Sequence, residues 1–135
     1  MLKLNLGCGQ DYKKGFINID NDKSIKADQY INLHNKFPFK NNSVDHILAQ
    51  DILEHFTKED ATIFLQECHR VMSNGSEIRM RVPNIYQIWK QFKNNPKVLM
   101  LFLYGNTQKT GIFGAHKYAY TMDMLEEILK LSGFT

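Results

Sequence analysis

The chain has 135 residues, of which 43% are hydrophobic, and this size and composition suit one domain around a single core. Its formal net charge is +3, and its basic residues are scattered rather than clustered, which disfavours nucleic acid as a partner. The longest apolar run, residues 98–104, is far shorter than the roughly 20 residues that span a bilayer, so we expect no membrane partner.

Four short strands are predicted in the first part of the chain, at residues 3–6, 16–19, 30–33 and 44–49. Thr57 and Asp60 resemble a capping box, and apolar residues then recur at helical spacing until Asn74-Gly75. Polar and apolar residues alternate over 77–82, which predicts a fifth strand with one polar face.

The remainder of the chain is predicted to be mainly helical. Residues 85–92 have helical spacing, Pro96 interrupts, and a second apolar piece covers 98–103. We interpret Trp89 and this apolar piece as parts of the core. A loop is expected from Gly105 to Tyr120, followed by a last helix between Thr121 and Gly133.

Strands separated by helices favour an open, mainly parallel α/β sheet, in which ligands bind at the carboxyl ends of the strands. Several polar or glycine residues fall at such ends: Gly7, Gly9, Asp20, Asn32-Leu33, Gln50-Asp51 and Asn84. Asp45 lies at the opposite rim and is interpreted as a structural hydrogen-bonding residue. These residues predict one ligand site along one edge of the sheet.

The glycine pair departs from the dinucleotide fingerprint G-x-G-x-x-G, because Tyr12 occupies the third position. Only residues 8–15 separate the first two strands, too few for an ordinary crossover helix whose N-terminus would receive a pyrophosphate. A nicotinamide-dependent oxidoreductase is therefore disfavoured. The loop and Asp20 suit a nucleoside without phosphates, although Asp20 could instead be a turn former.

Two cysteines, Cys8 and Cys68, are too few for a metal or disulfide framework, and we interpret both as buried thiols. His55 follows Glu54, but no HExxH pattern accompanies it, so we predict no metal site and read His55 as structural. Low cysteine content and the lack of a signal-peptide pattern suggest a cytoplasmic protein.

Four stretches, in order, carry a family resemblance: LNLGCG, NID, FPFKNNSVDHILAQDILEHF and ECHRVMSNGSEIRMRVPN, followed by His116-Lys117 and Thr121. The chain resembles the class I S-adenosylmethionine-dependent methyltransferases over nearly its whole length, 1–135, as a single domain. It is most similar to small members with a shortened first crossover, often associated with cell-surface polysaccharide and glycan pathways. The resemblance implies an α/β, Rossmann-like, doubly wound sheet.

Relatives continue into two further strands that this chain lacks after Thr135. The fifth strand would then lie at an exposed edge, where it could pair with a second copy. We therefore expect either a shortened protein that forms a homodimer through this sheet edge, or a fragment.

The resemblance also assigns roles to residues. Gly7 and Gly9 would pass under the methionine and ribose portions of S-adenosylmethionine, and Asp20 would accept hydrogen bonds from the ribose hydroxyls. Asn32 and the Leu33 backbone would face the adenine, and Gln50 with Asp51 the methionine end. The expected cofactor-binding residues are Leu6, Gly7, Cys8, Gly9, Asp20, Asn32, Leu33, Gln50 and Asp51.

Methyl transfer from a sulfonium needs mainly positioning and exclusion of water. Where the acceptor is a hydroxyl, a base assists, and the candidate catalytic residues by location are Asp51 and His116. A loop hydrogen-bonding role for His116 is an equal alternative. The expected function is methyl transfer to a small-molecule or glycan acceptor, giving S-adenosylhomocysteine; the alternative is an inactive methyltransferase-like module that binds the nucleoside or a protein.

Overall fold

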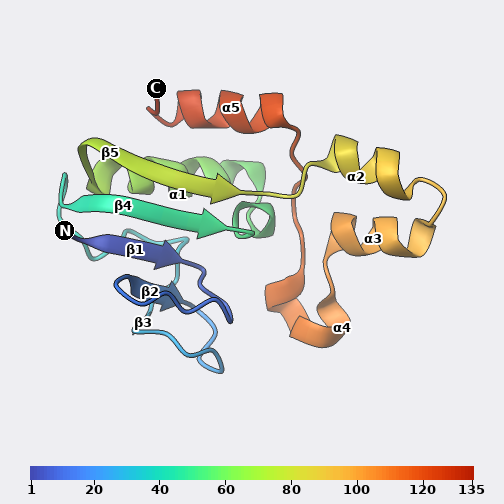
Figure 1. Cartoon of the computed structure of the whole chain (residues 1–135), viewed down its shortest axis with the longest axis horizontal. Helices are drawn as coiled ribbons and strands as arrows, with labels where there is room; N and C mark the ends of the chain where they lie inside the picture. Colours follow the sequence, from blue (N-terminus) through green and yellow to red (C-terminus); the bar gives the residue numbers. More distant parts are fainter.

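The structure is a computed structural model that describes residues 1–109, 111 and 114–135 in full. Five strands form one sheet in the order β3-β2-β1-β4-β5, and all paired neighbours run parallel (Figure 1). Their bounds are β1 Lys3–Leu6, β2 Ile17–Asp20, β3 Gln29–Tyr30, β4 Val44–Gln50 and β5 Met72–Arg81. This arrangement confirms the predicted parallel α/β sheet.

Helix α1 (Lys58–Val71) covers one face of the sheet, and α5 (Met122–Leu131) lies beside α1. The predicted cap is present, because the Thr57 hydroxyl accepts from the Asp60 N–H at 3.1 Å. Apolar residues at helical spacing bury one face of α1 against the strands: Ala61, Phe64, Leu65, Cys68 and Val71. Thr121 likewise caps α5, as its sequence predicts.

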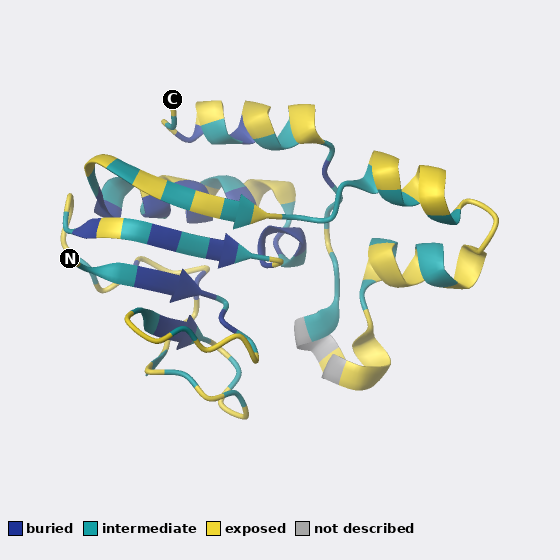
Figure 2. Ribbon diagram, viewed as in Figure 1, coloured by how far each residue is buried: buried dark blue, intermediate teal, exposed yellow. Residues whose placement is uncertain are grey.

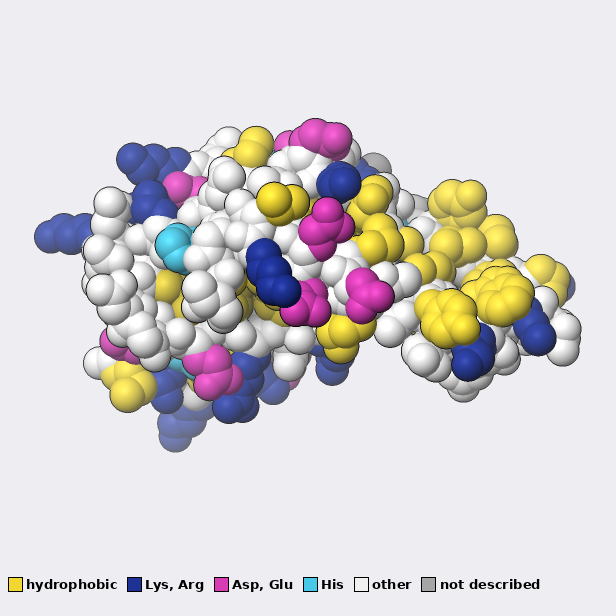
Figure 3. Space-filling model, turned by 90° about the horizontal axis from the view of Figure 1, so that it is seen from above, with side chains coloured by type: hydrophobic (Ala, Val, Ile, Leu, Met, Phe, Trp, Pro, Cys, Tyr) yellow, Lys and Arg dark blue, Asp and Glu magenta, His cyan; other side chains and the backbone are white. Residues whose placement is uncertain are grey.

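A pair of helices, α2 (Ile85–Phe92) and α3 (Pro96–Tyr104), extends away from the sheet (Figure 1). The expectation that they belong to the core is wrong, because no residue of either helix is buried (Figure 2). The Trp89 side chain is 50% exposed. The two helices pack on each other, with the Phe92 and Phe102 rings stacked at 5.5 Å, so their outer faces stay uncovered. Figure 3 shows apolar side chains gathered at this end of the molecule.

Element boundaries differ from expectation in three places. Helix α1 ends at Val71 rather than at Asn74-Gly75, and β5 starts immediately, with a bulge opposite the Val44–His46 stretch. Strand β3 has two residues, and Asn32-Leu33 follow it as a turn. The expected loop of 105–120 contains two short helical segments, α4 (Thr107–Thr110) and η2 (Gly111–Gly114).

The core lies between the sheet and α1, where Leu4, Leu6, Ile47 and Phe64 are almost fully buried. Asp45 has the structural role that the sequence predicts, because its carboxylate accepts from the Leu2 N–H at 2.7 Å. In the described part of the chain, no helix has the length and apolar content to cross a membrane.

Candidate cofactor cleft and active site

A cleft of about 470 Å³ opens at the carboxyl ends of β1, β4 and β5. Gly7, Cys8, Gly9, Gln50 and Asp51, all predicted from the sequence, line it. Asn5, Gln10, Asp11 and Arg81 complete the lining and were not predicted. The structure therefore brings the glycine loop and the end of β4 together, as expected for the edge of a parallel sheet.

Both glycines of the loop have left-handed backbones, with φ of +62° at Gly7 and +52° at Gly9. A Cβ at Gly7 would lie 2.4 Å from the Ile52 Cδ1 atom, whereas a Cβ at Gly9 would meet nothing within 4 Å. Gly7 thus permits close packing of the loop on the segment after β4. Gly9 leaves space where a ligand could approach the backbone.

Two buried asparagines shape the rest of this loop. Asn5 and Asn18 are register partners in β1 and β2, and the Asn5 side chain donates to the Asn18 Oδ1 at 2.9 Å. Asn5 also donates to the Asp11 carbonyl at 2.8 Å, and the Asn18 Oδ1 accepts from the Lys13 N–H at 2.8 Å. These bonds satisfy loop polar groups that a crossover helix would otherwise pair. A single asparagine in each of two apolar strands, LNL and INI, was the available signal.

Asp20 ends β2 and is bonded to the glycine loop. One carboxylate oxygen accepts from the Gly9 N–H at 2.8 Å, and the other accepts from the Asp22 N–H at 2.9 Å. Asp20 lies outside the lining of the cleft, but a carboxylate oxygen has capacity for a second hydrogen bond. Its position next to Gly9 leaves both the turn-forming and the ligand-binding interpretations open.

The other predicted residues lie outside the cleft lining. Leu6 is fully buried and Leu33 is buried. The Asn32 Oδ1 already accepts from the His34 N–H at 3.0 Å in a local turn. Asn84 caps α2 by accepting from the Tyr86 N–H at 3.1 Å, which accounts for its place after β5.

Asp51 and Arg81 face each other across the ends of β4 and β5. The Arg81 Nε lies 2.9 Å from the Asp51 Oδ2, and the Asp51 N–H donates to the Arg81 carbonyl at 2.8 Å. The pair raises the pKa of the Arg81 guanidinium. In the same cleft, burial and the nearby Asp20 charge raise the pKa of the Cys8 thiol to about 11, which supports its interpretation as an inert residue.

A second cluster lies next to Asp51: Glu54, His55 and His116, whose ligand atoms all fall within 4.8 Å of one another. Burial, followed by the Asp51 charge, raises the pKa of Glu54 to about 7. Burial is also the main cause that lowers the pKa of His55, and both His116 and Asp51 act on that ring. The His55 and His116 rings lie edge to face, with their centroids 4.9 Å apart.

Sequence reasoning missed Glu54 and interpreted His55 as structural. His55 does have a structural bond, because its Nδ1 lies 2.9 Å from the Ala115 carbonyl oxygen. The Glu54 side chain is only 3% exposed, and its Oε2 has no hydrogen-bond partner among the described residues. Adjacent Glu and His in the sequence were the available signal, but the third member lies more than sixty residues away.

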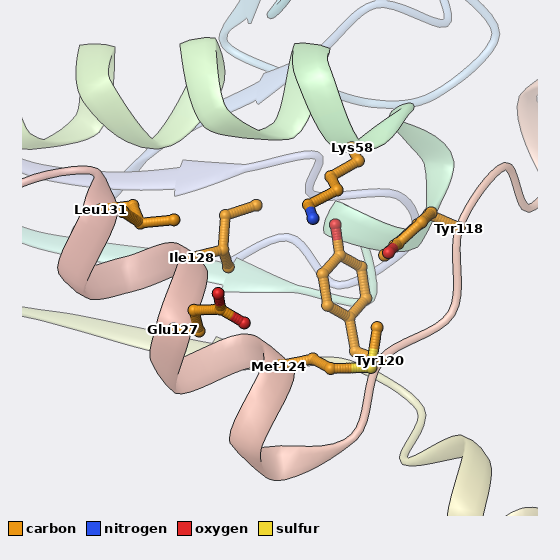
Figure 4. Close-up of a pocket in the computed structure, with 7 residues that line it drawn as sticks. All are labelled: Lys58, Tyr118, Tyr120, Met124, Glu127, Ile128 and Leu131. Atoms are coloured by element: carbon orange, nitrogen blue, oxygen red, sulfur yellow. The ribbon is translucent and has the colours of Figure 1, made fainter.

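A second pocket, of about 30 Å³, lies between α5 and the segment that precedes it (Figure 4). Its lining residues are Lys58, Tyr118, Tyr120, Met124, Glu127, Ile128 and Leu131. Space of this size holds one or two waters rather than a cofactor. The pocket therefore belongs to the packing of α5, and the cleft beside β1 is the candidate cofactor site.

Comparison with known proteins gives one family and several similar folds. Residues 4–80, more than half of the chain, match the family described as "Methyltransferase domain". No curated protein matches the chain. The chain is similar to the solved structure of a SAM-dependent methyltransferase from Archaeoglobus fulgidus, with a TM-score of 0.70 and 18% identity, over 98% of this chain and 60% of that one.

Two further solved structures are similar. A SAM-dependent methyltransferase from Thermotoga maritima has a TM-score of 0.70 and 13% identity, covering 99% of this chain and 64% of that chain. LepI in complex with SAM has a TM-score of 0.61 and 17% identity, covering 98% of this chain and 37% of that chain. At these identities the likeness concerns the fold. The chain spans 60% and 64% of the length of the first two relatives.

Proposed function

Because the chain belongs to the methyltransferase domain family, we propose that it binds S-adenosylmethionine in the cleft beside β1 and transfers the methyl group to a small-molecule or glycan acceptor. The observation that carries this proposal is the joint presence of Gly7, Gly9, Gln50 and Asp51 around one cleft. A nucleoside linked to an amino acid suits a cleft of about 470 Å³.

The residues around the cleft offer a partner for each part of such a ligand. Gly9 has no side chain and leaves its surroundings open, so the ligand can lie against the backbone. The Asp20 carboxylate next to it can accept from a pair of ribose hydroxyls through charge-assisted bonds. The Asp51 carboxylate lines the other side of the cleft and can face the ammonium group of the methionine portion.

Of the two candidate catalytic bases, Asp51 and His116, the hydrogen-bond partners favour His116. The Asp51 carboxylate already accepts hydrogen bonds from the Arg81 guanidinium, so its oxygens are engaged within the protein. The His116 Nδ1 lies 2.8 Å from the Phe102 carbonyl oxygen, an arrangement that suits Nδ1–H and leaves Nε2 as an acceptor. We propose that Nε2 accepts the proton of an acceptor hydroxyl as the methyl group is transferred.

Calorimetric titration with S-adenosylhomocysteine tests the cofactor proposal. We expect micromolar binding by the unaltered protein and at least about tenfold weaker binding by Asp20→Asn, which loses charge but little volume. Asp45→Asn is the matched control, because its carboxylate lies at the opposite rim of the sheet. Equal weakening by both variants would argue against a ribose-binding role for Asp20.

The same titration separates the proposal from its alternative. A folded protein that does not bind S-adenosylhomocysteine would support an inactive module that binds a protein partner. Consumption of the methyl donor with any acceptor would exclude that alternative. For an active protein, His116→Ala should lower turnover at saturating acceptor and leave S-adenosylhomocysteine binding unchanged, because His116 lies outside the cleft lining.

A further inference from the structure

The cluster of Glu54, His55 and His116 comes from two distant parts of the chain that backbone bonds fix together. Glu54 and His55 belong to η1 (Leu53–His55), directly after β4. The Glu54 carbonyl accepts from the Lys117 N–H at 2.8 Å, which places the segment carrying His116 against η1. The His116 N–H in turn donates to the Tyr104 carbonyl at 2.9 Å. The cluster is therefore built on hydrogen bonds on both sides of His116.

Both imidazole rings are oriented in the same manner. The Nδ1 of His55 lies 2.9 Å from the Ala115 carbonyl oxygen, and the Nδ1 of His116 lies 2.8 Å from the Phe102 carbonyl oxygen. A carbonyl oxygen only accepts, so Nδ1 is the donor in each ring and Nε2 is the nitrogen left to bind an ion. Histidines that bind metal ions are commonly oriented by such a bond from the other ring nitrogen.

One oxygen of the Glu54 carboxylate is buried without a hydrogen-bond partner among the described residues. Glu54 is only 3% exposed, and the oxygen without a partner in the described part of the chain is Oε2. A buried carboxylate oxygen without a partner costs free energy unless a cation, a donor or a proton satisfies it.

We propose that Glu54, His55 and His116 bind a divalent first-row transition metal ion, with Zn²⁺, Mn²⁺, Fe²⁺ and Co²⁺ as the candidates. Two imidazoles and one carboxylate suit these ions, whereas Mg²⁺ and Ca²⁺ prefer oxygen ligands alone. Three protein ligands leave a coordination position for water or an acceptor, as in metal sites that carry out chemistry.

The ligand atoms of Glu54, His55 and His116 would have to move closer together to bind one ion. The ligand atoms lie within 4.8 Å of one another, while ligand atoms around a tetrahedral ion with bonds of about 2.1 Å lie about 3.4 Å apart. The side chains must therefore approach by up to roughly 1.4 Å, which side-chain rotations can supply.

An ion here would lie beside the proposed cofactor cleft, because Asp51 lines the cleft and η1, which carries Glu54 and His55, begins two residues after Asp51. An Nε2 that holds a metal ion cannot accept a proton, so metal binding and the base role of His116 are mutually exclusive. The metal site goes beyond the proposed function and can be tested without an acceptor.

Cobalt binding to the full chain, without an affinity tag and after treatment with a chelator, provides the test. Co²⁺ coordinated by imidazole and carboxylate gives visible absorption bands, and calorimetry gives the stoichiometry. We expect one ion per chain with micromolar or tighter binding, displaced by Zn²⁺ but not by Mg²⁺. Glu54→Gln and His116→Ala should each weaken binding by at least about 100-fold.

His46→Ala is the matched control, because His46 lies near the start of β4, at the other end of the strand from the cluster. It should leave cobalt binding unchanged, and circular dichroism should show each variant folded. A folded protein that gives no cobalt bands would overturn the proposal, as would equal bands in Glu54→Gln. If His116→Ala does not fold, Glu54→Gln, which keeps the side-chain volume, decides the result.

Discussion

The Asp51 carboxylate and the Arg81 guanidinium form an ion pair within the lining of the cleft, with Arg81 Nε 2.9 Å from Asp51 Oδ2. Both side chains are largely exposed, so the pair should add no more than about 1 kcal/mol to stability. We expect the pair instead to influence the electrostatic potential at a bound cofactor. The positive sulfonium distinguishes S-adenosylmethionine from its neutral thioether product.

Arg81→Gln should therefore shift the preference of the cleft toward S-adenosylmethionine. Removing one positive charge from the lining of a water-filled cleft should favour S-adenosylmethionine over S-adenosylhomocysteine by roughly threefold. The ratio of the two calorimetric Kd values is the measurement. Arg79→Gln is the control, because Arg79 pairs with Glu77 and lies outside the cleft lining. A ratio that shifts equally in both variants would contradict the local effect.

The sequence was sufficient to predict the sheet and much of the cleft, because those features depend on local patterns. Alternating or apolar runs located the strands, and Gly7, Gly9 and Asp51 followed from residue type at strand ends. The boundary of α1 was harder, because Asn74-Gly75 is a turn signal that here lies within the bulged start of β5. Asn74-Gly75 indicated that the chain turns, but the residues alone did not show that the helix ends before this pair, at Val71.

Features that depend on distant contacts could not be predicted. Helical spacing shows that Trp89 lies on an apolar face, but not whether another element covers that face. Glu54 and His116 are separated by more than sixty residues, and only the crossing of the chain over η1 brings them together. No spacing rule for metal ligands spans such a distance.

The two glycines of the loop should respond differently to alanine. Both have positive φ, so an alanine at either position should cost about 1–2 kcal/mol in unfolding free energy. At Gly7 the new Cβ also meets Ile52 at 2.4 Å, and overpacking should add about 1–3 kcal/mol. Urea unfolding of Gly7→Ala and Gly9→Ala, with each protein the control for the other, measures this difference. Equal losses would show that the contact with Ile52 relaxes freely.

The Cys8 thiol should be unreactive at ordinary pH. Burial and the Asp20 charge raise its pKa from 9.0 to about 11, so its thiolate fraction at pH 8 should be about 100-fold smaller than that of a thiol with the ordinary value. Because the thiolate is the reacting form, alkylation by iodoacetamide should be slower by about this factor and should accelerate as pH rises toward 11.

Peptide mass spectrometry separates Cys8 from Cys68, which is fully buried. The denatured protein is the control, in which both thiols should react at ordinary rates. Bound S-adenosylhomocysteine should protect Cys8 further, because Cys8 lines the cleft. Rapid labelling of native Cys8 at pH 8 would contradict the effect of burial on its pKa.

Strand β5 ends the sheet in the described part of the chain, with β4 as its neighbour on one side. Its unpaired backbone groups can pair with a second copy, so we expect the light-scattering mass to rise toward two chains with concentration. The exposed outer face of α2 and α3 offers another contact, which Trp89→Glu would disrupt. A dimer that persists in Trp89→Glu supports pairing through β5. A mass of one chain at all concentrations, or a dimer lost in Trp89→Glu, contradicts it.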